Sequence, residues 1–190
     1  MRILVACERS GVVRDAFLAR GHDAVSCDLV ASEVDGPHVI GDALELARSG
    51  RWDMMIAFPP CTHLAVSGAR YFAEKRADGR QQAALQFVRD LMDVPIERIA
   101  LENPVGIISS QIRKPDQIIQ PWQFGEDASK KTCLWLKNIP PLMATGIIIK
   151  ERYANQTPSG QNKLGPSATR AMERSRTYQG IAGAMASQWG

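Results

Sequence analysis

The sequence has no long apolar run. Every apolar segment is far shorter than the roughly 18 residues that a membrane-spanning helix needs, so we expect no membrane span. The opening stretch holds only five consecutive apolar residues, Ile3 to Cys7, before Glu8 and Arg9 interrupt it, unlike a signal peptide. These features favour a cytoplasmic protein.

Cysteine is scarce and widely spaced. The four residues Cys7, Cys27, Cys61 and Cys133 form no C-x-x-C pair, which argues against a zinc site and against a disulfide framework. We therefore expect free thiols and no bound metal.

Charge of one sign is also in short supply. The formal net charge is +3, which permits contact with phosphates, but no concentrated basic patch stands out in the sequence. A length of 190 residues with 45% hydrophobic residues fits a single domain spanning residues 1–190.

Short apolar runs alternate with segments of helical periodicity. This alternation predicts an α/β fold with a doubly wound, mostly parallel, Rossmann-like sheet, in which ligands bind beyond the carboxyl ends of the strands. The expected strands are 2–7, 23–29, a short one within 38–46 that meets a turn at Gly41 and Asp42, 52–58 and 98–101, and the expected helices are 11–20 and 81–92.

The second half of the chain is less regular. Residues 133–136 and 146–150 are apolar enough for strands, antiparallel or at an edge of the sheet. Residues 155–167 are polar and rich in Gly and Pro, so we expect a mobile loop over about 153–177, followed by a C-terminal helix over about 178–189.

Two short motifs follow successive expected strands. Pro59-Pro60-Cys61 ends the strand 52–58, and Glu102-Asn103 ends the strand 98–101, about forty residues later. In this order and spacing the motifs resemble those of the S-adenosylmethionine-dependent cytosine-C5 methyltransferases of nucleic acids. The resemblance covers roughly residues 1–137 and the last helix, and it implies a methyltransferase-like fold and activity.

The resemblance assigns catalytic roles to three side chains. Cys61 would add as a thiolate to C6 of a cytosine and so make C5 nucleophilic, Glu102 would bind the N3 and amino edge of the base, and Asn103 would hold the loop. The alternatives from the residues alone are a packed, inert cysteine at position 61 and a simple turn or cap at 102–104. Family members usually have Val where this sequence has Pro104.

The resemblance also implies a site for S-adenosyl-L-methionine at the ends of the first three strands. The matching acids are Asp28 and Asp42, and each alone has a plain alternative as a turn or cap residue. The first loop has one glycine where the family usually has a Phe-x-Gly-x-Gly pattern. The candidate cofactor residues are Cys7, Glu8, Ser10, Gly11, Asp28, Asp42 and Pro59.

Five further residues are candidates for substrate contact. Pro60, Thr62 and His63 flank the thiol, and Lys130 and Lys131 lie where the family usually has a Gln and two Arg. A solvated pair of lysines and an exposed loop histidine are the alternatives.

The segment that could recognise a target sequence is short. Sequence-specific family members insert a recognition domain before the last helix, and here only residues 143–177 are available. The preferred partner is therefore DNA, bound through cytosine, single-stranded or with low specificity. Two alternatives stay open: a non-catalytic protein that binds nucleotides or nucleic acid, and methylation at C5 of a pyrimidine in RNA or in a free nucleotide.

Overall fold

A computed structural model describes residues 1–164, 167 and 170–190. It contains one seven-stranded sheet in the order β3-β2-β1-β4-β5-β7-β6. The strands are β1 (Arg2–Ala6), β2 (Asp23–Asp28), β3 (His38–Ile40), β4 (Met54–Ala57), β5 (Arg98–Pro104), β6 (Gln117–Ile119) and β7 (Thr132–Lys137).

Strands β1 to β5 run parallel, and β7 pairs antiparallel with both β5 and β6. This arrangement confirms the expected doubly wound, mostly parallel, Rossmann-like α/β fold.

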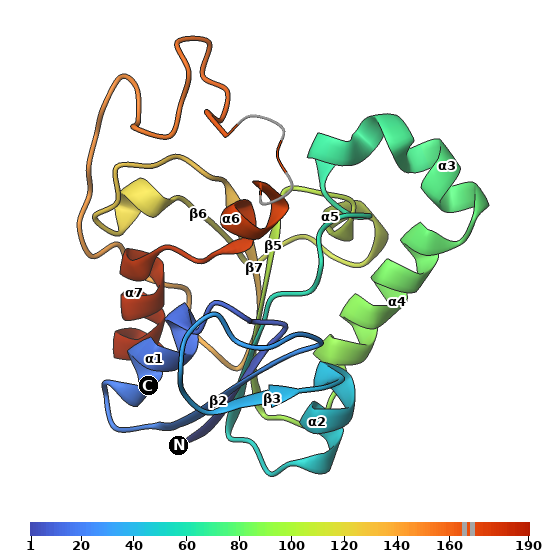
Figure 1. Ribbon diagram of the computed structural model, residues 1–190, viewed down its shortest axis with the longest axis vertical. Helices are drawn as coiled ribbons and strands as arrows, with labels where there is room; N and C mark the ends of the chain where they lie inside the picture. The colour runs from blue at the N-terminus through green and yellow to red at the C-terminus, as the bar shows by residue number, and fades with distance from the viewer. Residues whose placement is uncertain (165–166, 168–169) are drawn as a thin grey trace.

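Helices cover both faces of the sheet (Figure 1). One face packs against α1 (Val12–Leu18) and α7 (Gln179–Trp189), and the other against α2 (Ala43–Ser49) and α4 (Arg80–Met92). Alternate residues of β1 face these two cores, which explains why the strands read as unbroken apolar runs. The remaining helical segments are η1 (Val66–Tyr71), α3 (Phe72–Ala77), α5 (Ile108–Gln111), η2 (Pro121–Gln123) and α6 (Arg170–Ser175).

The register of the sheet brings the strand ends to one edge. Ala6 of β1 lies beside both Cys27 and Ala57, and Ala57 in turn lies beside Leu101. The chain order reverses between β1 and β4, so this edge is a switch point of the kind where α/β folds bind ligands. The loops after β1, β2, β3, β4 and β5 all begin there.

Several sequence predictions need correction. The expected strand at 146–150 is wrong, because only Gly146 forms an isolated bridge, to Phe124. The sequence reading also missed α2, α3 and β6. Within the expected mobile loop, α6 occupies Arg170–Ser175, and positions 165–166 and 168–169 lie outside the described residues. None of the described helices is long and apolar enough to cross a membrane.

Candidate active site

The loop that carries Cys61 is held at its base by β1 and β5. After the fully buried strand β4, the Phe58 amide donates to the Ala6 carbonyl at 2.9 Å. Asn103 Nδ2 then donates to the Pro59 carbonyl at 2.8 Å, across 44 residues of sequence. Two prolines fix their own φ angles, and this bond fixes the loop to β5, so Cys61 leaves the sheet in a defined direction.

Asn103 is almost completely buried, with 1% of its surface exposed. Its Oδ1 has no hydrogen-bond partner in the described part of the chain, while its Nδ2 serves the Pro59 carbonyl. The side chain therefore ties two strand ends together and keeps one acceptor unused.

Two buried polar side chains hold the turn that follows Cys61. Lys75 Nζ donates to the Thr62 carbonyl at 2.6 Å, and Gln81 Nε2 donates to the His63 carbonyl at 3.2 Å. Only 7% of Lys75 and 4% of Gln81 is exposed, although both residue types usually face solvent. The sequence reading missed both residues, because their partners are backbone carbonyls that only the folded turn presents.

The other turn residues face different surroundings. The Thr62 side chain is exposed, and His63 lies near the junction of α3 and α4. Hydrogen bonds from Arg80 lower the pKa of Asp78 at this junction, and the charge of His63 adds a weaker contribution. His63 thus lies beside α4, and its role in substrate contact stays a prediction.

Glu102 lies on β5 beside a small internal cavity. The Thr132 side chain and the Lys130 ammonium both lie close enough to interact with its carboxyl group. Burial raises the pKa of Glu102, while Lys130 and Thr132 oppose the rise. The cavity measures about 10 Å³ and is lined by Glu102, Lys130, Thr132, Thr177, Tyr178, Ile181 and Met185. This space holds about one water molecule.

The electrostatics of Cys61 link it to the same groups. Burial raises the pKa of the Cys61 thiol, the Glu102 carboxylate raises it further, and Lys130 and Arg174 lower it. Cys61, Glu102 and Lys130 therefore share one electrostatic environment. In this arrangement the thiol is protonated at neutral pH.

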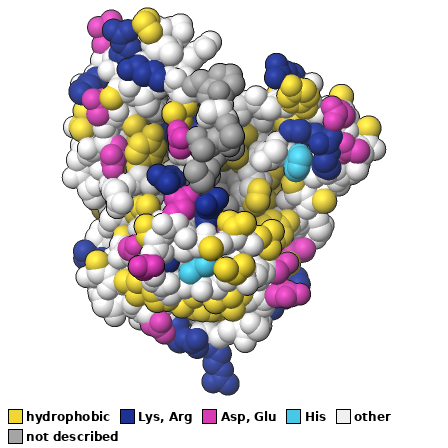
Figure 2. Space-filling view, in the orientation of Figure 1, with side chains coloured by type: hydrophobic (Ala, Val, Ile, Leu, Met, Phe, Trp, Pro, Cys, Tyr) yellow, Lys and Arg dark blue, Asp and Glu magenta, His cyan; other side chains and the backbone are white. Residues whose placement is uncertain are grey.

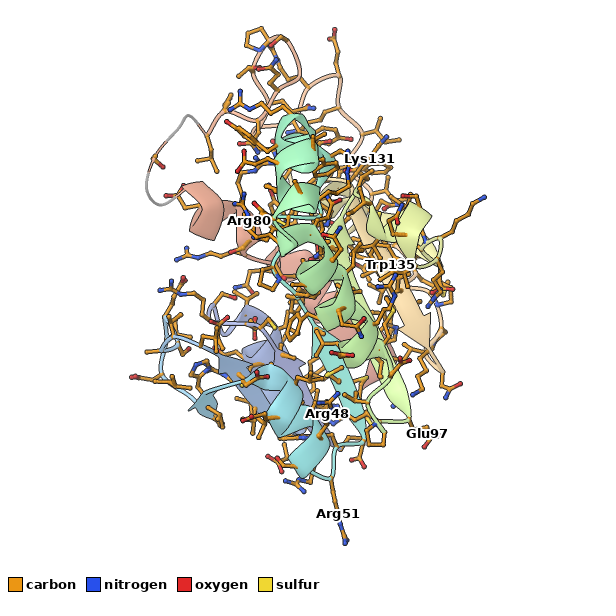
Figure 3. The ribbon with its side chains drawn as sticks, turned by 90° about the vertical axis from the view of Figure 1, so that its right-hand side faces the viewer. Arg48, Arg51, Arg80, Glu97, Lys131 and Trp135 are labelled. Carbon is orange, nitrogen blue, oxygen red and sulfur yellow. The ribbon has the colours of Figure 1, made fainter. Side chains whose placement is uncertain are left out.

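The two candidate lysines have different positions. Lys130 is half-buried and donates to the Arg174 carbonyl of α6 at 2.9 Å. Lys131 is exposed near one end of the molecule (Figure 3). Only Lys130 joins the group around Cys61 and Glu102.

The segment between α6 and α7 closes over Glu102. Within this segment, Arg176 forms an ion pair with Glu33 at 2.5 Å, and Glu33 also pairs with Arg9 at 3.2 Å. The Glu126 carboxylate accepts from the Gly180 amide at 2.8 Å. In Figure 2 the surface is hollowed between the upper left part and the arm that η1 and α3 form on the right.

Three of the candidate cofactor residues come together at the ends of β1 to β3. Burial, with smaller contributions from the charges of Asp28, Cys27 and Asp42, raises the pKa of Cys7 to about 12. Asp28 Oδ1 accepts from the Val30 amide at 3.3 Å. Both carboxylates therefore lie near the Cys7 side chain, at the switch point of the sheet.

Asp42 also has a structural function. Its Oδ1 accepts from the Leu44 and Glu45 amides at 2.7 and 3.3 Å, which makes it the N-cap of α2. The sequence reading weighed the roles of cap and ligand against each other, and the carboxylate has a second oxygen, Oδ2, that the cap does not use.

The first loop uses its polar groups internally. Glu8 is buried, and its carboxylate accepts from the Val13 and Arg14 amides at 2.7 and 3.2 Å and from Ser10 Oγ at 3.0 Å. Gly11 has a φ of 74°, and a Cβ there would lie 2.5 Å from the Val34 side chain. The Glu8 carboxylate thus caps α1, where a bound anion would otherwise find free amides.

An apolar surface adjoins the two acids. Leu29, directly after Asp28, is 76% exposed, and Ile40, two residues before Asp42, is 64% exposed. The sequence reading did not single them out, although an apolar residue directly after a strand-end acid was a visible signal.

Comparisons with known proteins are sparse. No family model and no curated protein matches the sequence. One similar solved structure, from E. coli, is of a protein provisionally assigned as a DNA modification methyltransferase encoded within a prophage. It is 14% identical, with a TM-score of 0.50, and the match covers 77% of this chain and 51% of that one. The chain spans about half the length of that structure, and the likeness supports a methyltransferase-like fold alone.

Proposed function

We propose that this chain transfers a methyl group to C5 of a cytosine in DNA, through a covalent adduct between Cys61 and C6 of the base. The observation that carries the proposal is the pairing of Cys61 and Glu102 at neighbouring strand ends, joined by the bond from Asn103 to the Pro59 carbonyl. A thiol and a carboxyl group in one electrostatic environment suit a ring that needs a nucleophile at one atom and a proton donor at another.

The strand ends fit the adenosine part of S-adenosylmethionine. Asp28 and Asp42 can accept from ribose hydroxyls and an adenine amino group, and the exposed Leu29 offers an apolar face to a ring. When bound, S-adenosylmethionine supplies an electrophilic methyl group on a sulfonium. Glu8 would act indirectly, by capping α1 and keeping the first loop in place.

Each residue of the pair has a defined task in the proposed reaction. Glu102, whose raised pKa favours the protonated form, donates to N3 of the cytosine. The Cys61 thiol gives up its proton to water, and the thiolate forms a bond to C6, so the electron pair of the C5–C6 double bond becomes available at C5. After C5 has gained the methyl group, its proton leaves to water, the double bond re-forms and the Cys61–C6 bond breaks.

The experiment that tests this proposal measures label transfer from S-adenosylmethionine to DNA of mixed sequence. We expect Cys61→Ala to lower the rate by more than about 10³-fold, the scale on which enzymes lose rate without their covalent nucleophile. Cys133→Ala removes another thiol and serves as the matched control. An oligonucleotide with 5-fluorocytosine should form a stable adduct with Cys61, because fluorine replaces the proton that must leave. Equal label transfer by the parent and Cys61→Ala would overturn the proposal.

A second candidate function is nucleotide or nucleic-acid binding without catalysis. It is favoured by the cavity at Glu102, which at about 10 Å³ is too small for a pyrimidine ring unless the segment between α6 and α7 moves. Calorimetry separates the two functions, because retained DNA binding with no S-adenosylmethionine binding supports only the second.

A further inference from the structure

A second, larger depression lies outside the site around Cys61. It is a solvent-open groove of about 480 Å³, lined by residues between Asp127 and Lys163. Its lining includes Arg152, Tyr153 and Gln156. In Figure 2, Lys and Arg side chains gather at the upper left, over the segment that Figure 1 draws in orange.

The groove has an excess of positive charge. The one carboxylate in its lining, Asp127, is paired with Lys150 at 2.5 Å and accepts from the Ala154 amide at 3.1 Å. Arg152 and Lys163 are exposed, and their side chains have no ion-pair partner in residues 1–164, 167 and 170–190. Two unpaired cations beside a neutralised carboxylate fit a ligand with more than one negative charge.

The groove also contains a rigid aromatic surface. The Tyr153 ring is stacked on Trp122, with centroids 6.4 Å apart and an interplanar angle of 15°. The Tyr153 hydroxyl donates to the Ile148 carbonyl at 3.1 Å, so the ring has a fixed orientation. An oriented ring in the same groove as two cations suits a strand of phosphates and flat bases.

Asn155 connects the groove to the candidate active site. Its side chain accepts from the Ser129 amide at 3.0 Å and donates to the Ser129 carbonyl at 2.9 Å, next to Lys130. It also opposes the rise that burial causes in the pKa of Tyr178, so it lies near this residue of the cavity at Glu102. Asn155, which lies in sequence between the groove residues Ala154 and Gln156, therefore connects the groove to Tyr178 in the cavity wall.

We infer that this groove binds the sugar–phosphate backbone of a nucleic-acid strand beside the target base, with Arg152 and Lys163 on phosphates and Tyr153 under a base or sugar. The inference rests on the proposed function and deepens it, since it assigns the surface that holds the polynucleotide strand beside the target cytosine. A free nucleotide would reach Glu102 without filling the groove.

The test compares the salt dependence of binding for two double variants. Arg152→Gln with Lys163→Gln removes both groove cations, and Arg48→Gln with Arg51→Gln removes the same charge at the opposite end of the molecule (Figure 3). Binding of a labelled 12-nucleotide strand is measured by fluorescence anisotropy over a range of salt concentrations, with DNA and RNA as separate arms.

We expect the groove variant to bind the strand roughly tenfold more weakly and to reduce the salt slope by about 1.4, since each single-strand phosphate contact contributes about 0.7. The control variant should keep the slope of the parent, and both should bind free dCMP as the parent does. Equal slopes for the two variants, or loss of dCMP binding by the groove variant, would overturn the inference. Since binding needs no catalysis, absent label transfer with a changed slope would refute only the proposed function.

Discussion

The charge of Glu102 affects the pKa of the Cys61 thiol. Burial raises the pKa of both groups, and the Glu102 carboxylate raises the pKa of the thiol further. When Glu102 takes up a proton, its negative charge disappears, and ionisation of Cys61 becomes easier. A substrate that binds to the protonated Glu102 would thus favour the thiolate that must attack it.

This coupling predicts the reactivity of the thiol in variants. Glu102→Gln removes the carboxylate charge, so it should lower the pKa of Cys61 and speed its alkylation by iodoacetamide severalfold, while methyl transfer falls. Lys130→Gln should have the opposite effect on alkylation, because the Lys130 charge lowers the pKa of the thiol. Mass spectrometry of the Cys61 peptide over a pH series measures both rates. Identical pH profiles for the parent and Glu102→Gln would contradict the coupling.

Lys75 gives a second prediction at this scale. It is absent from the groups that shift the pKa of Cys61, so we expect it to act by holding the Thr62 carbonyl at 2.6 Å. Lys75→Met leaves that carbonyl without its charged donor and should lower kcat about tenfold with little change in KM, since loss of position acts on the reacting geometry. Lys75→Arg should recover most of the loss. Equal kcat for the parent and both variants would rule out the positioning role.

The sequence alone points to the two residues of the proposed pair, but not to the two that hold the turn after Cys61. Cys61 follows a buried apolar strand and Glu102 ends the apolar part of the next one, so their positions at strand ends could be predicted without coordinates. Lys75 and Gln81 bind backbone carbonyls from a helical arm, and nothing in their own sequence surroundings announces those partners.

At the scale of elements, Asp42 combines a helix cap with a proposed ligand role. Asn caps as well as Asp does, so Asp42→Asn should leave the free energy of unfolding within a few tenths of a kcal/mol, whereas Asp42→Ala should lower it by about 1 kcal/mol. Both variants should bind S-adenosylmethionine more weakly, because the charge is gone. Urea denaturation gives the stabilities and calorimetry the affinities. Unchanged affinity in Asp42→Asn would leave Asp42 with the cap alone.

Element prediction succeeded where burial alone determines conformation. Strands β1 and β4 are buried on both faces, and their apolar runs could hardly form anything else. The run Ile147 to Ile149 is equally apolar, yet Ile147 and Ile149 are exposed, and Ile148 donates only to the Trp122 carbonyl at 2.8 Å. A strand at 147–149 would need a neighbouring strand to pair with. The sequence of these three residues does not show whether such a partner lies within reach.

At the scale of the whole molecule, the C-terminal helix α7 contacts both α1, near the start of the chain, and the cavity at Glu102. Helix α7 packs on α1, and its residues Ile181 and Met185 line the cavity at Glu102. Trp189 is fully buried, its Nε1 donates to the Pro140 carbonyl at 2.9 Å, and its own carbonyl accepts from Arg98 at 2.7 Å. The end of the helix is therefore fixed to the sheet far from the cavity.

The final prediction tests whether this distant anchor stabilises the site. Trp189→Ala should lower the free energy of unfolding by about 3–5 kcal/mol, the usual cost of removing a buried large aromatic side chain. The exposed Ser187→Ala on the same helix should stay within about 0.5 kcal/mol of the parent. Urea unfolding is followed by circular dichroism and by alkylation of Cys61. Both curves should shift together in Trp189→Ala, because α7 lines the cavity at Glu102, whose charge acts on Cys61. A shift in circular dichroism without a shift in Cys61 alkylation would mean that the site keeps its structure without α7.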